Sequence, residues 1–207
     1  MAEGPPTTGG RRALFVHPQD RAVVLGSAQR AGDADAERCA GQGWSVARRH
    51  SGGGAVVIVP GAQVWLDVFV PADDARAEAD VVKAASWLGE LWAAALGGCG
   101  LAELSVHHGG VLDAPFARVA CFTGLGPGEV TWRGRKVVGC SQRRTRAGAT
   151  LHTMCLLAAH QGELARLLAL DEAVRPALAA ALDASVGAVP LAAATLEVAL
   201  RDHLRAA

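Results

Sequence analysis

The chain of 207 residues carries no formal net charge, and 51% of its residues are hydrophobic against 19% that are charged. This balance is typical of a globular protein with a large core, and it argues against a protein that binds nucleic acid or anionic membranes. The length suits one sizeable domain. No apolar run is long enough for a membrane-spanning helix, so none is expected.

Cysteine usage and the start of the chain bear on the compartment. The five cysteines are scattered and odd in number, and no Cys-x-x-Cys pair occurs, so we expect neither a disulfide framework nor a metal site. The Gly/Pro/Thr-rich first ten residues lack the basic and apolar regions of a signal peptide. We therefore expect a cytoplasmic protein with a disordered leader over residues 1–12 and a single domain over residues 13–207.

The first half of the chain is patterned mainly for strands. Residues 22–25 are a short apolar run that ends at a glycine, and residues 63–70 alternate as a half-buried strand does. Two further runs, residues 44–49 and 55–59, flank a glycine-rich turn. Residues 33–43 suit a short helix with a loop.

The second half combines a long helix, short strands and a helical end. An apolar stripe at helical spacing predicts a long central helix that Asp73 or Asp74 caps and Gly97 ends. Short strands are expected over residues 104–157. Three helices should follow, over residues 162–170, 172–182 and 191–204. The pattern predicts an α+β fold, with a mixed β-sheet, one long central helix and a helical C-terminal end.

The first candidate site is the run Arg-Arg-His-Ser-Gly-Gly-Gly-Ala-Val over residues 48–56. Three consecutive glycines between two strands let the backbone approach a ligand closely. The two arginines supply bidentate donors for a carboxylate or a phosphate. The alternative interpretation is a flexible hairpin with two exposed arginines.

The second candidate site is a basic run that contains Lys136, one of only two lysines beside eighteen arginines. Six cations lie between residues 133 and 146, and the only acid from residue 130 to 169 is Glu163. The apolar residues at 137–139 interrupt the run, so part of it should be a buried strand from which Lys136 points along or into a site. This arrangement favours an anionic ligand or an acidic partner; the alternative is a solvated basic face.

Together these two segments resemble the lipoate–protein ligases. The run over residues 48–56 is similar to their lipoate-binding loop. Residues 134–139, Gly-Arg-Lys-Val-Val-Gly, resemble their catalytic lysine strand, with Arg143 and His152 at the family's spacing of seven and sixteen residues from Lys136. The resemblance covers residues 23–157. It implies the class II synthetase-like catalytic domain of the biotin/lipoate ligase superfamily.

The resemblance also implies roles. Lys136 would contact the lipoate carboxylate and then stabilise the charge that develops as the acceptor lysine attacks the acyl-adenylate. Arg143 and His152 would lie near the nucleotide. ATP and Mg²⁺ would activate lipoate, and the acceptor would be a lysine of an acidic lipoyl domain. The residues placed against the acyl group are Arg49, Ser51, Gly52, Gly53, Gly54, Ala55, Val56 and Gly139.

Two departures from the family pattern open further interpretations. Residues 57–62 read Val-Ile-Val-Pro-Gly-Ala where ligases carry Phe-His-Asp-x-Gly-Asn, and residues 124–127 read Gly-Leu-Gly-Pro where they carry an Asn-Asp pair. Polar groups that would surround phosphate and magnesium are thus replaced. An ATP-independent octanoyl or lipoyl transferase with Cys121 as thioester nucleophile is the second interpretation, since Cys121-Phe122 resembles the cysteine loop of that branch.

A third interpretation is a lipoyl-binding domain without catalysis. Residues 118–122 are strand-like, so Cys121 could also be a small core residue. The acyl group, whether lipoyl, octanoyl or biotinyl, stays open.

Overall fold

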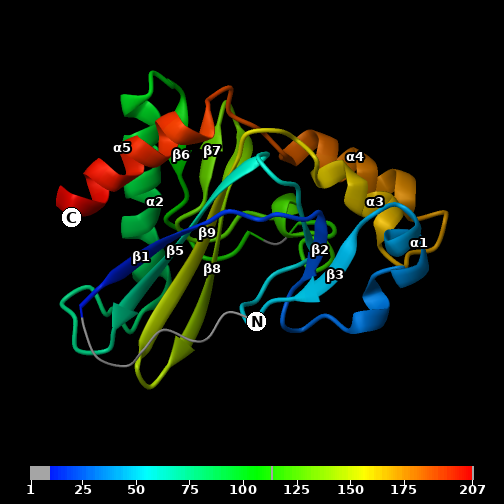
Figure 1. Cartoon of the computed structure of the whole chain (residues 1–207), viewed down its shortest axis with the longest axis horizontal. Coiled ribbons are helices and arrows are strands. Elements are labelled where there is room, and N and C mark those ends of the chain that lie inside the picture. Colours follow the sequence, from blue (N-terminus) through cyan, green and yellow to red (C-terminus); the bar gives the residue numbers. More distant parts are fainter. Residues whose placement is uncertain (1–9, 113, 207) are drawn as a thin grey trace.

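The computed structural model describes residues 10–112 and 114–206, and confirms the α+β fold (Figure 1). The predicted leader lies mostly outside the described residues, but its last residue, Arg12, already belongs to an edge strand that the sequence did not predict. The larger sheet has six strands in the order β1-β5-β9-β8-β7-β6, all paired antiparallel. Its strands are β1 (Arg12–Val16), β5 (Gln63–Pro71), β9 (Gly148–Leu156), β8 (Arg135–Thr145), β7 (Val130–Trp132) and β6 (Leu104–Val106).

One face of this sheet is covered by α2 (Val81–Gly98) and α5 (Ala193–Ala206). The alternation of β5 places Val64, Leu66, Val68 and Val70 in the same core as the apolar stripe of α2, as predicted. The predicted start of α2 was wrong. Asp80 is the N-cap, accepting the backbone N–H groups of Val82 and Lys83.

Asp74, one of the two predicted caps, instead lies in the turn that leads to α2. Its carboxylate accepts the backbone N–H of Arg76 at 2.9 Å and pairs with Arg11 at 3.2 Å. Those local bonds hold the backbone before α2 in a turn, so the helix cannot begin there.

The smaller sheet has the order β3-β2-β4, which corrects the hairpin interpretation of the glycine run. The central strand β2 (Ala22–Leu25) pairs parallel with β3 (Ser45–Arg48) and antiparallel with β4 (Val56–Ile58). The parallel pair is joined through α1 (Ala36–Gly41), so β3 and β4 lie on opposite sides of β2. Residues 49–55, here called the glycine loop, therefore cross the end of β2 and are no hairpin turn.

A second core lies between the small sheet and the other face of the large sheet. The short helices α3 (Leu164–Leu167) and α4 (Arg175–Ser185) close it, with α1, on the side away from α2 (Figure 1). Short 3₁₀ segments complete the fold, of which η2 (Cys121–Thr123) matters for the site; the others are η1 (Ala31–Asp33) and η3 (Gln161–Glu163). Among the described residues, no helix is both long and apolar enough to cross a membrane.

Candidate active site

The glycine loop is bonded directly to the segment that carries Cys121. We call residues 119–126 the cysteine loop. Ala55 donates its backbone N–H to the carbonyl of Val119 at 2.8 Å, and Cys121 donates to the carbonyl of Ala55 at 2.9 Å. A Cβ on Gly54 would lie 2.6 Å from the backbone nitrogen of Ala120, so only glycine permits this contact. The two loops, about seventy residues apart, therefore form one unit.

This close approach predicts a difference between two neighbouring glycines. Gly54→Ala should lower the free energy of unfolding by roughly 1–3 kcal/mol, because the new methyl group overlaps backbone that is bonded to Ala55. Gly52→Ala should change it by less than about 1 kcal/mol, because nothing lies within 4 Å of the added atom. Urea titration of both variants measures the difference, and equal stabilities would contradict the locked contact.

Two connected hollows lie beside these loops. A small apolar cavity of about 60 Å³ is lined by Val24, Val56, Ile58, Trp65, Phe122 and Met154, together with Arg49, Gly139, His152 and Thr153. A wider cleft of about 440 Å³ is lined by Gly52, Gly53, Lys136, Glu129 and residues 124–127, among others. Cys121, Cys140 and Ser141 line both. The glycine loop and the Lys136 strand thus meet at one cleft, as the sequence predicted.

Cys121 stands where the cavity and the cleft join. It is half-buried, and its Sγ lies 3.5 Å from where a Cβ on Gly53 would be. The predicted strand over residues 118–122 was wrong. Ala120 makes a single bridge to Ala55, and η2 then turns the chain, with the hydroxyl of Thr123 donating to the carbonyl of Ala120. This turn places Cys121 at the site, at the edge of the second core.

The other two cysteines near this region are poorer nucleophiles. Burial, helped by the carboxylate of Glu129, raises the pKa of Cys140, and burial raises that of Cys155. A thiol that keeps its proton reacts slowly. Cys140 and Cys155 are therefore poorly suited to act as nucleophiles.

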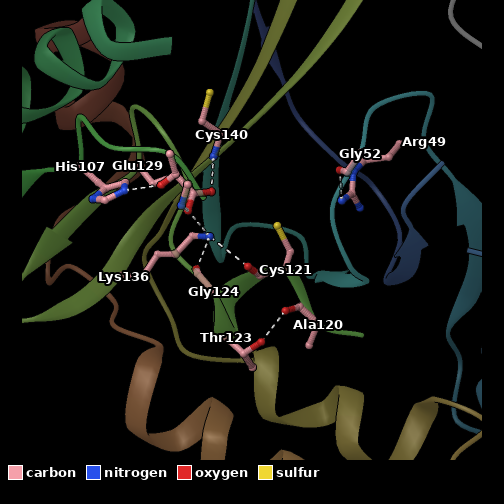
Figure 2. Close-up of polar contacts among 12 residues, drawn as sticks. Arg49, Gly52, His107, Ala120, Cys121, Thr123, Gly124, Glu129, Lys136 and Cys140 are labelled. Carbon is pink, nitrogen blue, oxygen red and sulfur yellow. Dashed lines mark hydrogen bonds and ion pairs between the residues drawn. The ribbon is translucent and has the colours of Figure 1, made fainter. Parts of the chain in front are cut away.

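Lys136 is buried on β8 and held by three acceptors (Figure 2). Its Nζ lies 2.6 Å from Oε2 of Glu129 and 3.0 Å from the carbonyls of both Cys121 and Gly124. The side chains of Lys136 and Glu129 are each only 4% exposed. An ammonium group has three N–H donors, so all three are engaged. Lys136 does line the cleft, as predicted, and it also fixes the cysteine loop to the sheet.

Glu129, which the sequence analysis missed, completes this network. Its Oε2 accepts the backbone N–H of Gly126 at 2.6 Å, and Oε1 accepts that of Cys140 at 3.0 Å. It follows the Gly/Pro turn seven residues before Lys136 in sequence. An acid directly before a strand and close to Lys136 in the sequence was the signal that could have identified Glu129 as its partner.

Removing this carboxylate should be costly. Glu129→Gln should lower the free energy of unfolding by about 3–5 kcal/mol, because the buried ammonium of Lys136 would lose its counter-charge. The matched control is Glu103→Gln, because Glu103 pairs with Arg133 at 3.1 Å while both side chains stay more than 60% exposed. That exposed pair should contribute about 0–1 kcal/mol. Equal losses in calorimetry or denaturant unfolding would show that Glu129 is not the counter-ion.

Arg49 shapes the glycine loop from within. Its Nη2 donates to the carbonyls of Gly52 at 2.7 Å and Gly54 at 2.8 Å, and Nη1 reaches the carbonyl of Val24 at 3.3 Å. Burial lowers the pKa of Arg49, and the nearby Cys121 opposes this shift. Arg49 thus both folds the loop and places a cation beside the cavity and Cys121.

The remaining predicted residues divide into three groups. Val56 and His152 line the apolar cavity, and Gly139 does too, although a Cβ there would meet the Phe122 ring at 3.1 Å. The glycine at 139 therefore makes room for Phe122. Ser51 and Ala55 are buried inside the loop, where Ser51 Oγ lies 2.9 Å from Ser141 Oγ. Arg143 is exposed on β8 and lines neither hollow.

This chain is similar to proteins of a known family. The profile of the family described as the lipoyl protein ligase A/B catalytic domain matches residues 6–190. A comparison with curated protein sequences gives no match.

Solved structures share the fold at low identity. The bipartite lipoate protein ligase of the Thermoplasma acidophilum lipoylation system, studied with its E2 lipoyl domain, matches with a TM-score of 0.73 and 20% identity, over 95% of this chain and 70% of that one. Lipoate-protein ligase A bound with ATP gives 0.71 and 19%, over 95% and 72%. P. falciparum LipL1 in complex with lipoate gives 0.67 and 14%, over 96% and 48%.

The profile match covers most of the chain and includes the glycine loop, Cys121, Lys136 and His152. The chain therefore belongs to the lipoyl protein ligase A/B catalytic domain family, as an enzyme of the ligase or lipoyl transferase kind.

Proposed function

We propose that this enzyme carries a lipoyl-type acyl group, octanoyl or lipoyl, as a thioester on Cys121 and passes it to a lysine of a lipoyl domain. The observation that carries the proposal is the position of Cys121, half-buried where the apolar cavity opens into the cleft and bonded to the glycine loop. A nucleophile at that junction would hold the acyl carbonyl while the chain lies among apolar side chains.

The reaction would run in two steps. In the first, the Cys121 thiolate attacks the carbonyl of an acyl thioester, the new C–S bond forms, and the carrier leaves as its thiol after taking a proton. In the second, the acceptor amine enters through the cleft, and a C–N bond replaces the C–S bond. Lys136 would fix the cysteine loop throughout and place its charge near the reacting carbonyl.

The residues around the cleft support thioester chemistry over an adenylate. The strand that follows the glycine loop, β4, consists of Val56, Val57 and Ile58, all buried, and residues 58 and 59 read Ile-Val where the ligase pattern has His-Asp. The Gly-Leu-Gly-Pro segment at residues 124–127 lines the cleft with backbone and apolar side chains. Lys136 already has three acceptors. These three features support a site that works without ATP and Mg²⁺.

An ATP-dependent ligase is the second candidate, and one arrangement favours it. Arg143 follows Ser141 by two residues on β8, so both project from the same face as His152 on β9. An exposed guanidinium there could bind a phosphate, and a solved ligase of the same fold holds ATP. In this candidate Lys136 would contact the acyl carboxylate after giving up one carbonyl.

The partner we propose is an acidic lipoyl domain, and the compartment the cytoplasm. Arg144 lines the cleft, and Arg143 and Arg146 are exposed at the same end of the β8–β9 hairpin. These cations would face the acceptor as its lysine enters. The five cysteines are free, which suits a reducing compartment.

One assay separates the candidates. The purified protein is incubated with apo lipoyl domain and either octanoyl-carrier protein or lipoate with ATP and Mg²⁺, and both proteins are read by intact mass. Acyl transfer from the carrier thioester without ATP is the expected result. Modification only with lipoate and ATP would overturn the transferase proposal in favour of the ligase.

A further inference from the structure

A row of polar side chains crosses the large sheet on the face of the apolar cavity. Asp67 on β5 lies directly opposite His152 on β9, and His152 lies opposite Ser141 on β8. Ser141 Oγ is 2.9 Å from Ser51 Oγ, so the row continues into the glycine loop. Two residues further along β9 on the same face, Met154 packs in the core. A row of polar side chains beside an apolar cavity suggests a functional role.

Within the row, the imidazole of His152 is oriented. Its Nδ1 lies 2.9 Å from Oδ1 of Asp67, and the indole Nε1–H of Trp65 donates to the same oxygen at 2.7 Å. His152 and Asp67 are 26% and 20% exposed, so neither is sealed from the site. When Nδ1–H donates to the carboxylate, the lone pair is on Nε2. The ring therefore keeps one proton acceptor.

His152 and Cys121 line the same cavity, and Ser141, the cross-strand neighbour of His152, lines both the cavity and the cleft. Neighbouring strands lie about 4.8 Å apart. The Nζ of Lys136 is directed at Glu129 and two backbone carbonyls. The other ionisable side chains that line the cavity are the guanidinium of Arg49 and the thiols of Cys121 and Cys140, which leaves the imidazole of His152 as the nitrogen that can accept a proton.

We infer that His152 is a catalytic residue of the second step, accepting the proton of the acceptor lysine as it attacks the Cys121 thioester, and that Asp67 positions its ring. The inference rests on the proposed function. The C–N bond forms and the C–S bond breaks, with the electron pair leaving on Sγ. The proton taken by Nε2 then passes to Sγ, which restores neutral His152 and the Cys121 thiol, so no other reactant is needed.

The test separates loading from transfer. Enzyme loaded on Cys121 from octanoyl-carrier protein is mixed with apo lipoyl domain, and loss of the acyl-enzyme is followed by intact mass. Once loaded, His152→Ala should transfer the acyl group about 10²–10⁴-fold more slowly than the wild type, the usual contribution of a general base. Added imidazole should restore part of the rate, which it would not do for a purely structural loss. His152→Gln keeps a donor for Asp67 and should be equally slow.

The remaining variants change Asp67 and, as a control, a surface histidine. Asp67→Asn should slow transfer, and it should add no further loss to His152→Ala, because both act through one ring. His108→Ala, whose ring pairs with Glu90 at the surface, should change neither step.

Transfer by loaded His152→Gln at the wild-type rate, or a defect in loading alone, would overturn the inference. A wild-type protein that takes no acyl group from the thioester would overturn the proposed function itself, and that outcome is visible before any variant is made.

Discussion

Cys121→Ser should abolish the acyl adduct on the protein and slow acyl transfer from a carrier thioester by about 10³-fold or more. The hydroxyl of serine fits the half-buried space beside Gly53, but it is not ionised near neutral pH and is a much weaker nucleophile than a thiolate. Intact mass of the enzyme after incubation with octanoyl-carrier protein measures the adduct, and the modified lipoyl domain measures turnover.

The matched control is Cys99→Ser. Cys99 is also half-buried, but it lies at the C-terminal end of α2, on the face of the large sheet away from the cavity. That variant should keep both the adduct and turnover. Undiminished transfer by Cys121→Ser would show that the acyl group is never bound to this sulfur. The ATP-dependent ligase would then be the remaining candidate function.

Lys136→Arg should reduce acyl transfer by about 10²-fold or more although it keeps the charge, in the range found when a preorganised donor is lost. The Nζ occupies a buried position with acceptors at 2.6, 3.0 and 3.0 Å, and it lies 4.8 Å from the centre of the Phe122 ring. A planar guanidinium is broader and aims its donors differently, so it cannot meet all three acceptors. The cysteine loop, and Cys121 with it, would shift.

The measurement is kcat/KM for transfer, with unfolding followed in parallel so that a loss of fold is distinguished from a loss of geometry. Lys83→Arg is the control, because Lys83 is exposed on the first turn of α2 and should tolerate the change. Near-normal transfer by a folded Lys136→Arg protein would mean that the network around Lys136 has no part in the reaction.

Local patterns predicted much of the fold and part of the site. The alternation of β5 and the stripe of α2 depend on short-range periodicity, and both were found where expected. The meeting of the glycine loop with Lys136 followed from the family resemblance. The order β3-β2-β4 could not be predicted from the sequence, because the pairing of three short strands depends on contacts between residues that are distant in the sequence.

The two acids of the site were missed for related reasons. Glu129 is buried only because β7 and β8 pair and bring it to Lys136. Asp67 stands on the side of β5 that simple alternation assigns to solvent, and its partner His152 is reached through cross-strand register, about eighty-five residues away. Single residues give little sign of such pairs until the register is known.

The burial of Lys136 has a consequence for the enzyme's own surface. A protein that holds a reactive thioester risks acylating itself, and amines are the groups at risk. Arginine stays protonated and does not act as an acyl acceptor, and eighteen of the twenty strongly basic side chains are arginine. With Lys136 enclosed by its three acceptors, Lys83 is the one lysine exposed to solvent. Under the proposed transferase mechanism, the surface thus offers the acyl thioester few amines to modify. A hydroxylamine-stable adduct found on the protein can then be assigned to Lys83 or the terminal amine, while a hydroxylamine-labile one reports the thioester.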